Sequence, residues 1–375
     1  MPNIQDHANA VGSLSLEERP FDALDGLILS QLVYLPMEGF LARDDRCTIE
    51  EAWVFLRDHV DIDSLDIFQK KRYLLFEVCA ELPRYACWGM TGYVNEIDVE
   101  KEMQFCACTY ELPGALRCIA FRGTDLTIVG WKEALNMSFM TVPSQKEAAE
   151  YVQRMAQGNG DSLILLGHSK GGNLSVYSGA TADASTRERI RRIYTYDGPG
   201  VDEKTLGSWG YSLVAQRIES YLPQSSVVGM LLHYHPVYTV VRAAAPGILQ
   251  HDAMTWQVRD GAFIQLAGVD MTGRLTDETI HAWLAEMEME ERRLLVDTLY
   301  QVVDAARGEL VTDLVADWRE SASRMLEAAR DLAPEVKKSV RRMLRSLFST
   351  GADEVFAIVT QRFAKRAEEE ENPER

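Results

Sequence analysis

Apolar residues recur at helical spacing along the first third of the chain. Between Pro20 and Pro36 the apolar positions fall on one face of a helix that the two prolines bound. Thr48 and Glu51 have the spacing of a capping box, which predicts that a second helix begins there. The stretch 74–82 repeats the helical period once more. The pattern therefore predicts a series of N-terminal helices.

From about residue 98 the apolar pattern changes to the alternation of a β-strand. Two short β-rich runs, 103–112 and 115–123, are separated by Pro113 and Gly114, which predicts a hairpin. The run 161–169 is almost continuously apolar, as expected of a parallel strand that is buried on both faces.

Two smaller patterns refine this part of the chain. Cys106 and Cys108 alternate along one predicted strand, so both are expected on the same face as small core residues. Ser144 and Glu147 have the spacing of another capping box, which predicts the start of a helix before the buried strand.

Strands and helices then alternate, which predicts an α/β sheet domain over roughly residues 95–262. Helical periodicity returns further on, so residues 270–367 are expected to form an all-helical C-terminal extension. The last residues, 368–375, are expected to be an acidic disordered tail. Residues 1–17 are expected to be flexible.

Composition excludes several classes of function. The 375 residues include 57 Asp and Glu against 39 Lys and Arg, a formal net charge of −18. Such acidity disfavours nucleic acid as a partner, because phosphate contacts need basic side chains. No metal site or cofactor is expected, since the six cysteines lack the spacing of zinc ligands. No signal peptide is apparent, and no apolar stretch approaches the roughly 20 residues that span a bilayer, so the expected location is the cytoplasm.

The five residues from Gly167 to Gly171, GHSKG, fit G-x-S-x-G, the nucleophile elbow of α/β hydrolases. A buried strand precedes this motif and a helix follows it. A strained turn between them exposes the hydroxyl of Ser169, and glycines are needed where side chains would collide. The helix N-terminus also favours a developing oxyanion. The alternative is a glycine-rich turn that carries an inert serine.

A serine elbow requires an acid and then a histidine further along the chain. Asp197 ends the next predicted strand and is the candidate acid, although an aspartate before glycine also caps ordinary turns. His251, in a loop after the last core strand, is the candidate base. His233 and His235 are its competitors, but they lie on an apolar run, where histidines are more often structural.

Two donors to the oxyanion are expected. The backbone N–H of Lys170 is the first, because this residue follows the nucleophile. The second has to come from an earlier loop, where Gly123 and Thr124 offer a backbone N–H and a hydroxyl. The alternative is a simple turn at Gly123.

Together these motifs resemble those of the fungal-type (class 3) lipase-like α/β hydrolases, and most of all an uncharacterised bacterial branch of them. The resemblance rests on FRGTD, a following GW, GHSKGGNLSVYSG, a histidine five residues before Trp256, and a helix similar to PFDALDGLILSQLVYL. It covers roughly residues 18–262 and implies an α/β-hydrolase-like sheet flanked by helices. The site residues that it implies are Ser169 as nucleophile, His251 as base, and Thr124 and Lys170 at the oxyanion hole.

The chain departs from this family at two positions. In typical members the acid comes later in the chain, at a position that is Ser226 here, so Asp197 is expected to replace it. Lys170 stands where an apolar residue is usual, which keeps the backbone donor and implies a more polar pocket.

The leading hypothesis is a serine hydrolase that cleaves a carboxylic ester or lipid substrate through this Ser-Asp-His triad. The second is a catalytically degenerate hydrolase fold that serves as a binding or scaffold module, which the missing acid at the usual position motivates. The apolar segment 126–143 is expected either to form a lid or acyl-binding wall, or to pack in the core through Trp131 and Phe139.

One segment of the C-terminal extension is basic. Residues 334–349 combine apolar side chains at helical spacing with lysines and arginines on the other face. Such a helix suits contact with a membrane surface or an acidic partner. The alternative is packing on acidic neighbours in the same chain.

Overall fold

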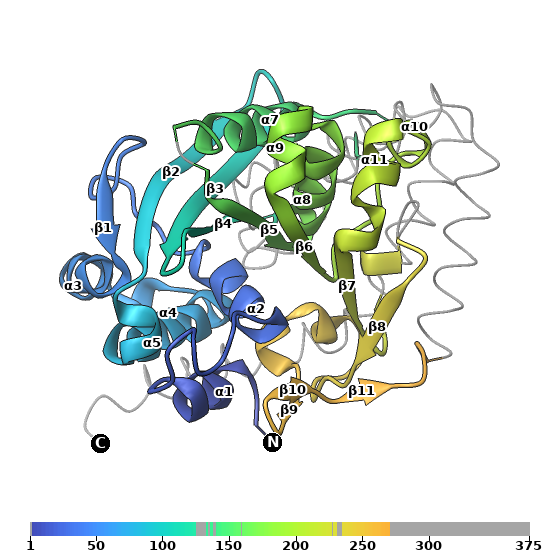
Figure 1. The fold of residues 1–375 in the computed structure, drawn as a ribbon. Helices are drawn as coiled ribbons and strands as arrows, with labels where there is room; N and C mark the ends of the chain where they lie inside the picture. The colour runs from blue at the N-terminus through green and yellow to red at the C-terminus, as the bar shows by residue number, and fades with distance from the viewer. Residues whose placement is uncertain are drawn as a thin grey trace, which may run out of the picture.

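A nine-stranded mixed sheet forms the centre of the part of the chain that the computed structural model describes (Figure 1). The described residues are 2–270, without 125–132, 134–135, 138–139, 159, 227 and 231–234. In their order across the sheet, the strands are β1 (Arg46–Thr48), β2 (Gly89–Asp98), β3 (Met103–Leu112), β4 (Leu116–Phe121), β5 (Ser162–His168), β6 (Ile190–Tyr196), β7 (Ile218–Pro223), β8 (Tyr238–Val241) and β11 (Gln265–Leu266). A separate antiparallel pair consists of β9 (Val258–Arg259) and β10 (Ala262–Phe263).

The sheet is antiparallel at both edges and parallel in between. β1, β2, β3 and β4 pair antiparallel, the strands from β4 to β8 pair parallel, and β11 pairs antiparallel with β8. The carboxyl ends of β5, β6, β7 and β8 therefore lie along one edge of the sheet. In open α/β sheets this is the edge at which sites form.

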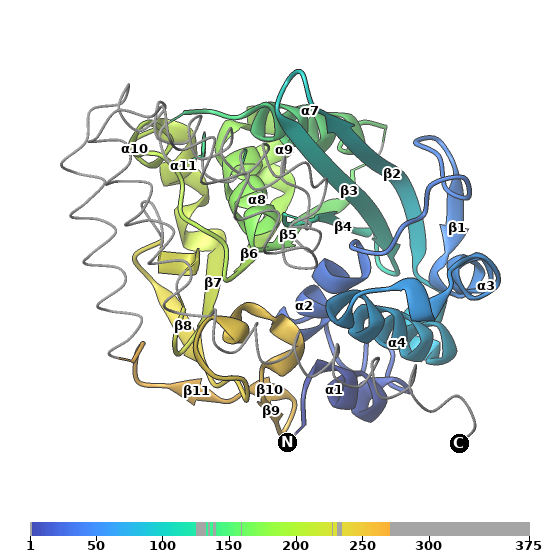
Figure 2. The same ribbon diagram turned by 180° about the vertical axis from the view of Figure 1, so that it is seen from behind.

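Two groups of helices cover the sheet (Figures 1 and 2). The N-terminal group is α1 (Ile4–Val11), α2 (Ala23–Leu32), α3 (Ile49–His59), α4 (Ile67–Glu81) and α5 (Pro83–Ala86). The later group is α7 (Pro143–Met155), α8 (Lys170–Thr181), α9 (Ala184–Arg189), α10 (Glu203–Leu206) and α11 (Trp209–Val214). Short 3₁₀ helices are η1 (Ile62–Ser64), η2 (Ala215–Arg217), η3 (Val228–Met230), η4 (Gly247–His251) and η5 (Ala253–Thr255).

The order of the strands explains why the helices divide in this way. β4, β5, β6 and β7 are consecutive both along the chain and across the sheet. Right-handed crossovers that always advance in one direction put all of their helices on the same face. α7, α8 and α11 are these crossover helices, and they pack in one core. The opposite face is left to α1, α2 and α4, which bury it.

β5 shows how one strand serves both cores. Its residues Leu163 and Leu165 pack with the crossover helices, whereas Ile164 and Leu166 pack with the N-terminal helices. This confirms the prediction of a parallel strand that is apolar because both of its faces are buried. The fold class is thus an α/β-hydrolase-like sheet flanked by helices, as predicted.

The N-terminal helices follow the predicted pattern with one exception. α2 and α3 are present where predicted, and Thr48 and Glu51 form the capping box of α3. The expectation that residues 1–17 are flexible is wrong. They include α1, which packs on α2 and α4 with Ile4 and Ala8 buried. The apolar i, i+4 spacing of these two residues is the signal that was overlooked.

The sheet extends beyond the predicted limits of 95–262, since β1 and β2 precede them and β11 follows. β2 escaped prediction because its register shifts between Thr91 and Val94, where Gly92 has a φ of +68°. A bulge of this kind interrupts the alternation by which a strand is found in a sequence.

The capping box predicted from Ser144 and Glu147 is also wrong. α7 begins at Pro143, and the side chain of Gln145 accepts a hydrogen bond from the backbone N–H of Val142. The backbone N–H of Ser144 donates instead to the carboxylate of Glu133, at 2.9 Å. The start of α7 is therefore capped locally by Gln145 and through a tertiary contact by Glu133.

Several predictions lie outside the described residues. They are the helical extension over 270–367 beyond residue 270, its basic segment 334–349 and the acidic tail 368–375. Trp131 and Phe139 of the segment 126–143 also lie outside, but Met137 and Val142 of this segment are buried in the core of the crossover helices. No helix in the described part of the chain combines the length and apolar character of a membrane span.

Candidate active site

Ser169 lies on the turn between β5 and α8, with backbone angles φ +58° and ψ −132°. A non-glycine residue in this region is strained, as expected of a nucleophile elbow. The backbone N–H of Ser169 donates to the Tyr196 carbonyl at 2.9 Å, which ties the turn to β6. A Cβ atom on Gly167 would collide with the backbone of Gly171, and one on Gly171 with the carbonyl of Phe121. Both glycines therefore serve the close packing of this turn.

Asp197 follows β6 directly, on the strand beside the elbow, and its side chain is 1% exposed. Its backbone φ is +46°, a conformation that aspartate tolerates better than most residues. The carboxylate oxygen Oδ2 lies 2.6 Å from Nδ1 of His251. The other oxygen, Oδ1, accepts hydrogen bonds from the Ser226 hydroxyl and, at 3.1 Å, from the backbone N–H of Gly229. Both oxygens of this buried carboxylate are thus engaged.

The resemblance implies that typical members carry the acid at the position of Ser226, and here the Ser226 hydroxyl contacts the carboxylate of Asp197. The two positions are therefore close in space although 29 residues separate them in the sequence. A Cβ atom on Gly229 would lie 2.5 Å from Oδ1 of Asp197, so a side chain there would displace the carboxylate. Sequence reasoning missed both donors, because neither belongs to a motif.

His251 ends the 3₁₀ helix η4, in the loop that follows β8. Its ring lies next to that of His168, the residue before the elbow serine, with the ring centroids 4.6 Å apart. The loop is held by Gln250, whose carbonyl accepts from the indole N–H of Trp256 and whose side chain accepts from the backbone N–H of Ser225. The ring of His251 therefore lies beside the ring of His168 and beside the carboxylate of Asp197.

The competing histidines have other surroundings. His235 contacts the Tyr211 hydroxyl at 2.9 Å through Nδ1, and burial lowers its pKa. His233 lies outside the described residues. Asp197 thus contacts His251, whereas His235 contacts Tyr211.

The loop after β4 lies against Ser169. A Cβ atom on Gly123 would lie 2.9 Å from Cβ of Ser169. The backbone N–H of Gly123, however, donates to the Tyr34 hydroxyl at 3.0 Å. Of the two residues expected to offer the second oxyanion donor, Gly123 is therefore engaged elsewhere, and Thr124 remains the candidate beside the backbone N–H of Lys170.

Comparison with known proteins identifies the family of the chain. A family model described as Mbeg1-like matches residues 79–301, more than half of the chain. The chain belongs to the Mbeg1-like family. This is a lipase-like family, which confirms the lipase-like resemblance seen in the sequence. A solved structure titled "Crystal structure of M37 lipase" is 12% identical, with 54% of this chain and 68% of that chain covered and a TM-score of 0.33. No curated protein sequence matches the chain.

In this Mbeg1-like protein the side chain of Lys170 does not make a pocket more polar, contrary to expectation. It is 1% exposed and its ammonium pairs at 2.8 Å with the carboxylate of Glu133, which has no exposed area. The ammonium also donates to the side chain and backbone carbonyl of Gln104. Glu133 accepts further bonds from the backbone N–H groups of Gln104 and Ser144, at 3.0 and 2.9 Å. Both charges are therefore compensated inside the protein.

Burial shifts the pKa of other groups in this Mbeg1-like protein. It lowers the pKa of His168 well below the usual value of 6.5, with a smaller contribution from His251, so the His168 ring is neutral. It also raises the pKa of the Cys47 thiol to about 12. Cys106 and Cys108 are buried on one face, as predicted, and behave as core residues.

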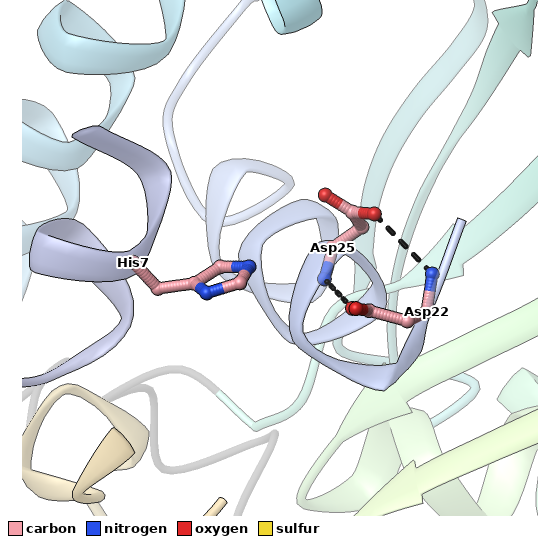
Figure 3. Close-up of side chains that lie close together, drawn as sticks. All are labelled: His7, Asp22 and Asp25. Atoms are coloured by element: carbon pink, nitrogen blue, oxygen red, sulfur yellow. Dashed lines mark hydrogen bonds between the residues drawn. The ribbon is translucent and has the colours of Figure 1, made fainter. Parts of the chain in front are cut away.

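One cluster in the described part of the chain has the composition of a metal site. His7, Asp22 and Asp25 offer ligand atoms within 4.8 Å of one another (Figure 3). Asp25, however, is paired with Arg84 at 2.6 Å, and Asp22 with Arg19 at 2.6 Å. The two aspartates also cap α2 by bonding to each other's backbone N–H groups, as the dashed lines of Figure 3 show. Two guanidinium groups already neutralise the carboxylates, so the cluster fits a structural cap rather than a cation site.

Proposed function

We propose that this protein is a serine hydrolase that cleaves carboxylic esters, with Ser169 as nucleophile, His251 as base and Asp197 as the acid that orients it. One observation carries the proposal. The buried carboxylate of Asp197 lies 2.6 Å from Nδ1 of His251, at the strand end next to the elbow. Nδ1 is thereby the protonated ring nitrogen, and Nε2 remains to take a proton.

In the proposed first half-reaction, Ser169 Oγ bonds to the ester carbonyl carbon while His251 Nε2 takes its proton. The bond from this carbon to the alcohol oxygen then breaks, and the proton on Nε2 passes to the leaving alkoxide. Water repeats the sequence on the acyl-serine and releases the carboxylic acid. Asp197 stabilises the imidazolium that forms each time and is not itself protonated.

The negative charge on the carbonyl oxygen needs two donors in the same mechanism. The backbone N–H of Lys170, the residue after the proposed nucleophile, belongs to the first turn of α8 and is the first donor that we assign. We assign the second donor to Thr124, because the N–H of Gly123 is held by Tyr34. The ion pair between Lys170 and Glu133 fixes the residue that carries the first donor.

The alternative of a degenerate hydrolase fold was motivated by the serine at the usual position of the acid. The contact between Asp197 and His251 removes that motive, since an acid reaches the histidine from the neighbouring strand. We therefore favour an enzyme over a binding module.

A fluorophosphonate probe and a p-nitrophenyl ester test the proposal together. The wild-type protein is expected to be labelled and to hydrolyse the ester, and Ser169→Ala to do neither. Ser178→Ala is the matched control, because this serine is also buried, on the same helix, with its hydroxyl bonded to the Leu174 carbonyl. Labelling that persists in Ser169→Ala, or a folded wild type that is neither labelled nor active, would overturn the proposal.

A further inference from the structure

A chain of hydrogen bonds joins the three loops of the proposed site behind the reacting atoms. The backbone N–H of Gly123 lies 3.0 Å from the Tyr34 hydroxyl, which lies 3.2 Å from Nδ1 of His168. Nε2 of His168 lies 2.7 Å from the carbonyl of His251. We infer that Tyr34, from the N-terminal helical layer, is a positioning residue that acts through His168 to hold the elbow, the oxyanion loop and the loop of the base together. This inference rests on the proposed function.

The direction of each bond follows from the chemistry of the atoms. A carbonyl oxygen only accepts, so His168 has to carry its proton on Nε2 and donate it to His251. The ring is neutral because it is fully buried, so Nδ1 is unprotonated and accepts from Tyr34. The tyrosine oxygen in turn accepts from the N–H of Gly123. The Nε2–H tautomer of His168 therefore allows the hydrogen bonds that join all three loops to form together.

The Tyr34 side chain is itself firmly held. The residue follows α2, is 6% exposed and packs in the core of the N-terminal helices. The guanidinium of Arg72, on α4, lies 3.7 Å from the centroid of the tyrosine ring, within the range of a cation–π contact. Arg72 also donates to the side chain of Gln31 at 3.1 Å. The hydroxyl thus comes from a rigid support rather than from a surface loop.

A second contact from the same layer reaches the same loop. Lys71, which precedes Arg72 on α4, pairs with the carboxylate of Asp252 at 2.6 Å. Asp252 is buried and adjoins His251 in the sequence. One face of the N-terminal layer therefore holds the base loop by an ion pair and by the bond through His168. We assign this supporting role to the N-terminal helices, which carry none of the proposed reacting groups.

The test is the removal of one hydroxyl. Tyr34→Phe keeps the aromatic ring over Arg72 but leaves His168 and Gly123 without their partner. We expect kcat for a p-nitrophenyl ester to fall about 10- to 100-fold, the size of effect that follows from slight misplacement of reacting groups, with KM within about twofold. The rate of fluorophosphonate labelling is expected to fall by the same factor.

Tyr93→Phe is the matched control. Tyr93 is also buried in the same core, and its hydroxyl likewise accepts from a backbone N–H, that of Met37, and bonds to a side chain, that of Glu38. It makes no bond to the elbow. Both variants are expected to lower the melting temperature by similar amounts, whereas only Tyr34→Phe is expected to lower kcat. Equal losses of kcat in the two variants would overturn the inference.

Nitrogen NMR of ¹⁵N-histidine protein provides a readout that does not need activity. In the wild type, His168 is expected as the Nε2–H tautomer, with the Nδ1 resonance of a nitrogen that accepts a hydrogen bond. Tyr34→Phe is expected to shift this resonance to that of an imidazole nitrogen without a donor. If the wild type hydrolyses no ester, the proposed function fails. NMR alone then tests whether the hydrogen bonds from Gly123 through Tyr34 and His168 to His251 form. A wild-type His168 that carries its proton on Nδ1 overturns the inference.

Discussion

Each of the two helical layers contains a buried ion pair, and the two ion pairs have different roles. In the N-terminal layer Arg84 and Asp25 are both without exposed area and approach to 2.6 Å. The guanidinium also donates to three backbone carbonyls, and the hydroxyl of Tyr85 donates to the same carboxylate at 2.9 Å. A planar group with five donors suits this task, because it joins several chain segments at once. Its contacts are all within its own layer.

On the other face, Lys170 and Glu133 form the comparable pair. Lysine presents a single compact charge, and this one lies one residue after the proposed nucleophile, Ser169. Breaking the pair would therefore disturb the first turn of α8, which carries the proposed oxyanion donor. The Arg84–Asp25 pair thus stabilises the N-terminal layer alone. The Lys170–Glu133 pair stabilises the other layer and also the turn that carries the proposed site.

The largest expected effect separates two acids near His251, namely Asp197 at the end of β6 and Asp252 in the same loop as His251. Asp197→Asn is expected to lower kcat for ester hydrolysis about 10⁴-fold, the loss that the corresponding change causes in serine proteases, because the amide no longer stabilises the imidazolium. Asp252→Asn is expected to cost no more than about 10-fold, since this acid pairs with Lys71 rather than with the ring of His251. Steady-state kinetics at neutral pH measure both, and losses of equal size would contradict the assignment of the acid.

The next effect compares the ion pairs themselves. Arg84→Met and Lys170→Met are each expected to lower the free energy of unfolding by about 3–5 kcal/mol, because each leaves a buried carboxylate unpaired. Urea denaturation measures this loss. The activity of the folded fraction is expected to fall only in Lys170→Met, and the double variant Lys170→Met/Glu133→Gln is expected to recover stability. If Arg84→Met also impairs the folded enzyme, the division between the layers is wrong.

A smaller effect concerns the support of the acid. Ser226→Ala removes a donor to the buried carboxylate of Asp197 but leaves the bond from Gly229. We expect kcat to fall about 10- to 100-fold, since a hydrogen bond to a charged group contributes about 1.5–3 kcal/mol. Ser225→Ala serves as the neighbouring control, because the hydroxyl of Ser225 bonds to Asp270 instead. A Ser226→Ala enzyme with wild-type kcat would show that the hydroxyl does not support the acid.

The smallest effect is one of pH on stability. His168 stays neutral when folded, whereas in the unfolded chain it takes up a proton below about pH 6.5. The unfolded state then binds more protons, so the free energy of unfolding falls as the pH falls below this value, by up to about 1.4 kcal/mol per pH unit for this group. Denaturation of wild type and His168→Gln at about pH 7 and 5.5 measures its share. The variant is expected to have the shallower slope, and identical slopes would contradict a buried neutral His168.

The part of the site that could be predicted from the sequence is the part made of local signals. The elbow at Ser169 is recognisable in the sequence by the glycines that lie two residues before and two residues after the serine. Asp197 and His251 were identified by their order along the chain and by the ends of predicted strands. Chain order is a useful guide here because parallel neighbouring strands bring their carboxyl ends to one edge.

The part that could not be predicted depends on tertiary contacts. Nothing near Lys170 in the sequence shows that its ammonium meets Glu133, and nothing near Ser226 shows that it touches Asp197. Likewise β2 was missed because a bulge at Gly92 breaks its alternation. Lys170 and Ser226 each meet a partner from another segment of the chain, whereas β2 contains a local irregularity, and the periodicity of the sequence reveals neither.

The hydrogen bond between Tyr34 and His168 spans 134 positions, and the ion pair between Lys71 and Asp252 spans 181. Contacts so distant along the chain form late, because long loops have to close first. During synthesis the N-terminal helices and the serine leave the ribosome well before the base loop that completes the set. On the proposed mechanism, a nascent chain that ends before residue 251 displays a nucleophile that cannot be activated, so hydrolysis begins only with a nearly finished fold.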